Sequence, residues 1–149
     1  IFDISDLNLV NQFSIKMTNK SKKILSEISA GELLDKISIL EIKLEKIKDK
    51  NSLDEIDKEY KILKNAQNSN IEITDKIEKL FKEIKEVNAN LWDIEDKLRI
   101  CEKNKDFRKN FTELARKVYL NNDKRSKIKL QINKILGSNI REIKQYVNY

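Results

Sequence analysis

The chain has 149 residues, of which 38% are charged, with no proline and two glycines. This composition excludes a sheet protein with many tight turns and favours long helices in a single domain. The net charge is +6 and histidine is absent, which excludes the common zinc sites and histidine-based catalytic triads.

Other absences narrow the class of protein further. Cys101 is the only cysteine, so no intramolecular disulfide forms. No apolar run approaches the ~20 residues of a membrane-spanning helix, and the first residues lack the pattern of a secretory signal. Glycine-rich phosphate loops are also missing. We therefore expect a cytoplasmic protein without membrane contact, cofactor, metal ion or catalytic residue.

The first predicted element is an arm over residues 1–28, which has weak periodicity and many polar side chains. We expect this arm to be weakly ordered or to dock elsewhere. A helix is predicted from Ser29, because Ser29 and Glu32 fit a capping box. Apolar residues then recur at helical spacing: Leu33, Ile37, Leu40, Leu44 and Ile47.

A polar interruption follows this apolar seam. Ser52 and Glu55 fit a second capping box, followed by Leu53, Ile56, Tyr60 and Leu63. Sequence alone leaves open whether residues 33–66 form one bent helix or two.

The longest apolar pattern begins near Thr74 and predicts a long third helix. Its seam residues are Ile77, Leu80, Ile84, Val87, Leu91, Ile94, Leu98 and Cys101. After a polar break the spacing resumes in a fourth helix, with Phe107, Phe111, Leu114, Val118, Ile128, Ile132 and Ile135. Gly137 suits the left-handed residue after a helix, and Ser138 is predicted to cap a last short helical segment.

These elements predict an all-α fold, an elongated antiparallel helical bundle or coiled-coil hairpin with three to five helices. Short connections favour antiparallel neighbours, and residues 29–149 are expected to form one helical domain. A helix of about 28 residues spans roughly 42 Å, which is long for a compact globule. The register between helices does not follow from the sequence.

A second row of side chains lies beside each of the two long seams. On the third helix this row contains Trp92, Glu95 and Arg99, and on the fourth it contains Tyr119 and Asn122. Antiparallel packing would bring such residues together. The resulting candidate polar cluster comprises Trp92, Glu95, Asp96, Arg99, Arg116, Tyr119, Asn122, Arg125 and Lys129.

Two interpretations of this cluster stand side by side. The aromatic rings offer stacking faces and the arginines suit phosphate or carboxylate, which would make an anion-binding pocket. The favoured interpretation is a structural network, because polar residues at seam positions fix register and partner choice.

The predicted function is a non-enzymatic helical interaction or scaffold module that self-associates or binds another protein through its helical faces. The alternative is binding of nucleic acid or an anionic ligand, such as a phosphate or sugar nucleotide, through residues 107–149. That region has 11 basic and 3 acidic side chains. On a helical wheel its basic residues are predicted to be spread around the helix rather than clustered: Arg108, Lys109, Arg116, Lys117, Lys124, Lys127, Lys129 and Lys134.

A third and weaker alternative is a small helical enzyme of chorismate-mutase type. Such an enzyme needs only arginines, a lysine and an acidic or amide group around a dicarboxylate. Arg99, Arg116, Arg125 and Lys36 are the residues available for that role.

Three runs in the chain resemble a small bacterial and phage family classed as a domain of unknown function. They read GELLDKISILEIKLEKI, NLWDIEDKLR and FTELARKVYLNNDKRSKIKLQINKILGSNIREIKQY, and the resemblance covers about residues 29–149. It implies a helical domain with no established activity. It marks polar motif positions without assigning their roles: Glu32, Asp35, Lys36, Glu41, Lys43, Trp92, Glu95, Asp96, Arg99, Arg116, Tyr119, Asn122, Asp123, Arg125, Lys129 and Asn133.

Overall fold

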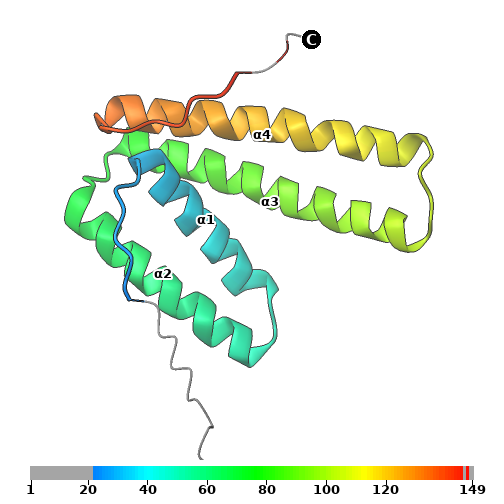
Figure 1. Cartoon of the computed structure of the whole chain (residues 1–149), viewed down its shortest axis with the longest axis horizontal. Coiled ribbons are helices and arrows are strands. Elements are labelled where there is room, and N and C mark those ends of the chain that lie inside the picture. Colours follow the sequence, from blue (N-terminus) through cyan, green and yellow to red (C-terminus); the bar gives the residue numbers. More distant parts are fainter. Residues whose placement is uncertain (1–21, 146, 148–149) are drawn as a thin grey trace, which may run out of the picture.

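The computed structural model describes residues 22–145 and 147. This part of the chain contains four helices and no strand: α1 (Ala30–Lys46), α2 (Lys50–Asn70), α3 (Asp75–Lys103) and α4 (Lys109–Ile135). Figure 1 shows α3 and α4 as a long antiparallel hairpin, with a shorter hairpin of α1 and α2 packed against one end. The predicted elongated, antiparallel all-α bundle is confirmed.

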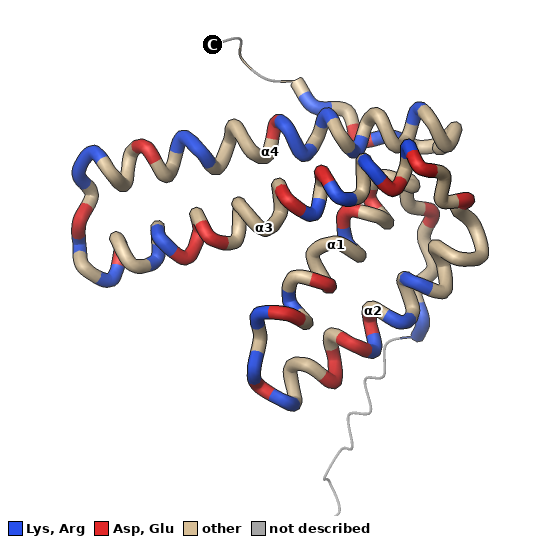
Figure 2. The backbone as a smooth tube through the Cα atoms, turned by 180° about the vertical axis from the view of Figure 1, so that it is seen from behind, with Lys and Arg blue, Asp and Glu red and all other residues tan. Residues whose placement is uncertain are grey.

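The two hairpins diverge along their length. Figure 2 shows, from the opposite side, that α2 lies away from the long hairpin and that α1 separates the two. α1 packs against α2, α3 and α4 and is therefore the central helix of the bundle. The predicted arm over residues 1–28 falls outside the described residues up to residue 21, and residues 22–28 form no helix or strand.

The start of α1 agrees with the sequence in one respect. The Ser29 hydroxyl accepts a hydrogen bond from the Glu32 N–H at 3.2 Å, as a capping serine does. The Glu32 carboxylate bonds instead to Lys129 of α4. Half of the predicted capping box therefore serves the helix start, and the other half serves tertiary packing.

Residues 33–66 form two helices, because the chain leaves the helical conformation at residues 47–49. Ile47 is extended, with ψ of 140°. The predicted capping box at Ser52 and Glu55 is wrong. Asp49 begins α2 by accepting a hydrogen bond from the Ser52 N–H at 2.8 Å, so Ser52 already lies inside the helix.

Most of the core lies where the two hairpins meet. This proximal core comprises Leu33, Leu34, Ile37, Ile77, Leu80, Ile84, Val87, Leu91, Ile128 and Ile132. A distal core farther along the long hairpin has three buried residues, Ile94, Cys101 and Leu114. The third-helix seam is thus confirmed, with Leu98 half-buried beside the distal core. No helix within the described ranges is long and apolar enough to cross a membrane.

The ends of the fourth-helix seam differ from the prediction. Phe107 precedes α4 and is half-exposed, although its ring packs edge-to-face on Phe111 with centroids 5.3 Å apart. Ile135 is also exposed at the last turn. Ile135 is exposed because of the side of α4 on which it lies, since the following Leu136 still packs against the proximal core.

The chain after α4 also departs from the prediction. Gly137 adopts the expected left-handed conformation, with φ of 63°. The last short helix predicted after Ser138 is wrong, since residues 138–145 contain none. Ser138 instead accepts a hydrogen bond from the Ala30 N–H at 3.0 Å and so caps α1. Ile143 is 84% exposed, so a last helix would have had no core against which to pack.

Candidate functional site

A buried polar network joins α1, α3 and α4. The Asp35 carboxylate on α1 is completely buried and accepts hydrogen bonds from Arg125 Nε at 2.8 Å and Nη2 at 2.5 Å. Asn88 of α3 donates to both Asp35 and Ser38 at 2.8 Å. The hydrogen bond to Asp35 raises the pKa of Arg125 despite partial burial. The network thus gives the buried Asp35 carboxylate a charged partner in the half-buried Arg125 and a neutral one in Asn88.

A second network fixes the chain ends around the start of α1. The buried Lys129 ammonium donates to Glu32 at 2.6 Å and to Glu142 at 2.9 Å. Burial disfavours the charge on Lys129, but these two hydrogen bonds outweigh it and raise its pKa. The same contact lowers the pKa of Glu142. Lys129 therefore has two carboxylate partners and a structural role at this position.

The α1 and α4 backbones approach closely beside this network. The Gly31 N–H donates to the Asn133 side-chain oxygen at 2.7 Å. A Cβ on Gly31 would lie 2.5 Å from the Lys129 carbonyl oxygen. Only glycine fits at this crossing without movement of one helix.

Most of the predicted cluster lines one pocket between α1, α3 and α4. The pocket has a volume of about 300 Å³. Its predicted members are Trp92, Glu95, Asp96, Arg99, Asn122 and Arg125, and the remaining walls are formed by Ile39, Ile42, Asn88 and Leu91. Trp92 is half-buried there. The polar row of α3 and Asn122 of α4 are therefore brought together as the sequence suggested.

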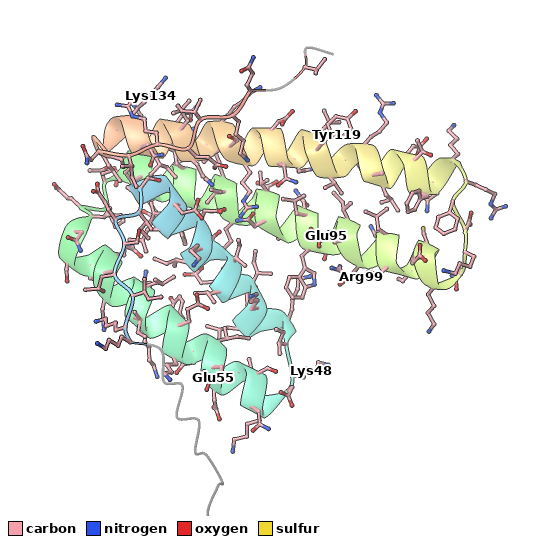
Figure 3. All side chains as sticks on the ribbon, in the orientation of Figure 1. Lys48, Glu55, Glu95, Arg99, Tyr119 and Lys134 are labelled. Carbon is pink, nitrogen blue, oxygen red and sulfur yellow. The ribbon has the colours of Figure 1, made fainter. Side chains whose placement is uncertain are left out.

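The other three cluster residues lie elsewhere. Arg116 and Tyr119 are exposed on α4, where a hydrogen bond to Tyr119 raises the pKa of Arg116. Figure 3 shows Tyr119 at the outer edge of α4, away from Glu95 and Arg99 on α3. Lys129 belongs to the network around Glu32. The expected proximity of Arg116 and Tyr119 to the pocket is wrong, because their positions on α4 point away from α3.

The two pocket arginines already have carboxylate partners. Arg99 lies 3.2 Å from Glu95 and 3.7 Å from Asp96, and its side chain is 69% exposed. Arg125 is engaged by Asp35. An anionic ligand in this pocket would have to compete with these carboxylates, which favours the structural interpretation of the cluster.

The residues proposed for a chorismate-mutase-like set do not converge. Lys36 faces α2, where it lies 3.9 Å from Glu59, and Arg116 is on the outer side of α4.

Across the residues that the structure describes, no group of three or more acidic or thiol side chains is placed to hold a metal ion.

An open groove continues from the pocket toward the tip of the long hairpin. This distal groove has a volume of about 480 Å³. Its apolar walls are Leu98, Phe111, Ala115 and Val118, and its polar rim is Glu95, Arg99 and Glu102. The pocket and the groove share Glu95 and Arg99. Sequence reasoning assigned Leu98, Phe111 and Val118 to the apolar seams of the two long helices and did not predict the groove.

The outer face of α4 is strongly basic. Six exposed residues of α4 are cations, Lys109, Arg116, Lys117, Lys124, Lys127 and Lys134, and one, Glu113, is an anion. At 100° per residue these cations fall within an arc of about 100°. The predicted spread around the helix is wrong, because Arg108 precedes α4 and Lys129 is buried. Figure 2 shows that Lys and Arg predominate among the charged residues of α4, whereas on α3 basic and acidic residues alternate.

The comparisons with known proteins bear on the family of the chain. No curated protein and no solved structure gives a significant match. A family model described as "Family of unknown function (DUF6165)" matches residues 24–148, which include all four helices and both polar networks. The chain therefore belongs to this family of unknown function.

Proposed function

We propose that the protein is a helical interaction module that pairs with a second copy of itself through the distal groove. The observation that carries this proposal is the unequal length of the helices. α1 has 17 residues, whereas α3 and α4 have 29 and 27. α1 packs against both long helices near one end, and Figure 1 shows the hairpin extending well beyond it. The surface that α1 covers proximally is open distally.

The walls of the distal groove suit a helix from another chain. Leu98, Phe111, Ala115 and Val118 give it an apolar floor, with small Ala115 allowing close approach. Two such hairpins laid groove to groove would form a four-helix arrangement, the usual way to bury wide apolar faces of helical hairpins. Pairing with a second copy would therefore cover the apolar surface that remains exposed in the distal half of one chain.

The charges on the rim favour a second copy as the occupant. Glu95 and Arg99 are four residues apart on α3 and carry opposite charges. If two α3 helices pair antiparallel about a two-fold axis at the level of residue 97, Glu95 of each lies beside Arg99 of the other. The two intrahelical ion pairs, one in each chain, are thereby exchanged for two intermolecular ones, as in isologous interfaces with complementary flanking charges.

Charge reversal tests this pairing directly. The wild-type chain is expected to sediment as a dimer, whereas Glu95→Arg and Arg99→Glu should each be monomeric because like charges then face each other. Mixing the two variants should restore a heterodimer, since each supplies the charge that the other lacks. Analytical ultracentrifugation measures all three species.

The matched control is the exposed ion pair of Asp57 and Lys61 on α2, also four residues apart. Asp57→Lys and Lys61→Glu should leave the dimer intact. A wild-type chain that remains monomeric at the highest soluble concentration overturns the proposal. A dimer unaffected by both α3 reversals also overturns it, because the interface would then lie elsewhere.

A further inference from the structure

We propose that the basic outer face of α4 binds the phosphodiester backbone of nucleic acid without sequence preference. This face is distinct from the distal groove. Phe111, Ala115 and Val118 line the groove from one side of α4, and Lys117, Lys124 and Lys127 stand roughly opposite at 100° per residue. A partner on this face and a second copy in the groove can therefore be bound together.

The charge on this face does not simply reflect a lysine-rich chain. α3 is of similar length and also exposes six cations, but seven of its exposed residues, between Asp75 and Glu102, are acidic. On α4 the only exposed acid is Glu113, and the other, Asp123, is half-buried. The same supply of lysine thus yields a balanced surface on α3 and an unbalanced one on α4.

Several of these cations are available to a ligand. Lys117, Lys124, Lys127 and Lys134 form no salt bridge with any carboxylate in the described part of the chain. In contrast, the inward-facing Arg125 and Lys129 are engaged by Asp35, Glu32 and Glu142. The outer face does hold one ion pair, Lys109 with Glu113 at 3.7 Å, but its other lysines have no such partner among the described residues, whereas the inward-facing cations are paired.

The shape of the face favours a nucleic-acid backbone over other polyanions. The 27 residues of α4 form a straight ridge of roughly 40 Å at 1.5 Å per residue. Lysine ammonium groups act as point charges for phosphates and carry no base-reading geometry, which fits binding without sequence preference. A membrane-surface helix would instead need a broad exposed apolar face, and here Tyr119 and Leu120 are isolated among charges.

Fluorescence anisotropy with labelled DNA duplex, RNA duplex and single-stranded DNA provides the test. Binding should weaken with salt, and the triple variant Lys117→Gln, Lys124→Gln, Lys127→Gln should reduce the slope of log K against log [salt] by about 3. Its affinity at low salt should fall by roughly tenfold or more. The DNA and RNA arms show which backbone is preferred.

The matched control removes the same charge from other faces, by Lys50→Gln, Lys58→Gln, Lys79→Gln. All three lysines are exposed on α2 or α3. The control should bind almost as tightly as the wild type. Equal losses in both triple variants overturn the proposal, because net charge alone would then explain binding. So does lysine-dependent binding to phosphatidylserine vesicles or polyglutamate without binding to any nucleic acid.

The result is separable from the proposed self-association. The α4 triple variant should sediment like the wild-type chain, and Glu95→Arg should still bind nucleic acid through a single basic face. A chain that is monomeric but binds nucleic acid would therefore remove the proposed dimer and retain this inference.

Discussion

Asp35 and Arg125 lie 90 residues apart in the chain, yet they form a two-pronged ion pair that joins α1 to α4. Asp35 is completely buried, so Arg125→Ala would leave its carboxylate without a charged partner. We expect a loss of about 3–5 kcal/mol in the free energy of unfolding. Urea denaturation followed by circular dichroism measures it.

Lys82→Ala is the control for this substitution. Its ammonium is exposed and pairs with Glu78 within α3, so the loss should stay below about 1 kcal/mol. Replacing Asp35 and Arg125 together with leucine should be milder than Arg125→Ala alone, because no buried charge is stranded. An Arg125→Ala chain as stable as the Lys82→Ala chain would contradict the structural role of the pair.

Gly31→Ala should weaken the crossing of α1 and α4. The new Cβ would lie 2.5 Å from the Lys129 carbonyl oxygen, so one helix must move. A loss of about 1–3 kcal/mol is expected from such overpacking. Thermal or chemical unfolding measures the change.

Gly137→Ala provides a useful contrast, because nothing lies within 4 Å of a Cβ there but φ is +63°. Its cost of about 1–2 kcal/mol would come from the backbone and not from packing. Asn133→Ala should not rescue Gly31→Ala, because the Lys129 backbone carbonyl would still clash with the new Cβ and the Gly31 N–H would lose its acceptor. A Gly31→Ala chain as stable as the wild type would contradict the close packing of α1 on α4.

Acid should loosen the contact between the segment after α4 and Lys129. The hydrogen bond from Lys129 lowers the pKa of Glu142 below its ordinary value of 4.5. A lowered folded-state pKa gives stability that is present above pH 4.5 and is lost as pH falls through the folded value. The difference in unfolding free energy between wild type and Glu142→Gln should therefore shrink below about pH 4.5.

The pKa of Lys129 sets the upper pH limit of this contact. Its pKa is raised above 10.5, so its contribution is complete below that pH and is lost only as pH rises through the folded value. Glu86→Gln, on the exposed surface of α3, is the matched control. If the Glu142→Gln effect were the same at pH 7 and pH 3, the ion pair would not be its source.

The distal half of the long hairpin should open more readily than the proximal half. Only Ile94, Cys101 and Leu114 are buried there, whereas the proximal core has ten buried residues. Local stability follows the buried apolar contacts of a segment. Hydrogen exchange in the Glu95→Arg chain should thus be faster over residues 94–118 than over residues 77–91. Equal protection of both ranges would contradict this division of the core.

The regular parts of this fold were predictable from sequence because they rest on local rules. Ser29 and Thr74 are capping residues whose side chains bond three positions ahead. The seam from Ile77 to Cys101 follows from helical spacing alone. The Asp49 cap was missed because Ser52 offered an equally good local pattern three residues later.

Features that depend on register were beyond sequence reasoning. Trp92, Glu95 and Asn122 were placed together correctly, since antiparallel packing of the two long helices brings their rows close. The expectation for Tyr119 is wrong, because Tyr119 lies on a different side of α4 from Asn122 and is exposed to solvent instead of lining the pocket. The partner of Arg125 was also missed, since Asp35 comes from a third helix whose crossing point the spacing does not specify.

The capping of Ala30 by Ser138 has a consequence for biosynthesis. Ser138 accepts a hydrogen bond from the Ala30 N–H at the start of α1, but it is translated 108 residues after Ala30. Asn133, which receives the Gly31 N–H, also emerges late from the ribosome. A nascent chain exposing only α1 to α3 therefore lacks both acceptors and the α4 wall of its core. Stable folding must wait for nearly the whole of the described chain, so the growing polypeptide depends on remaining unaggregated until synthesis of this region is complete.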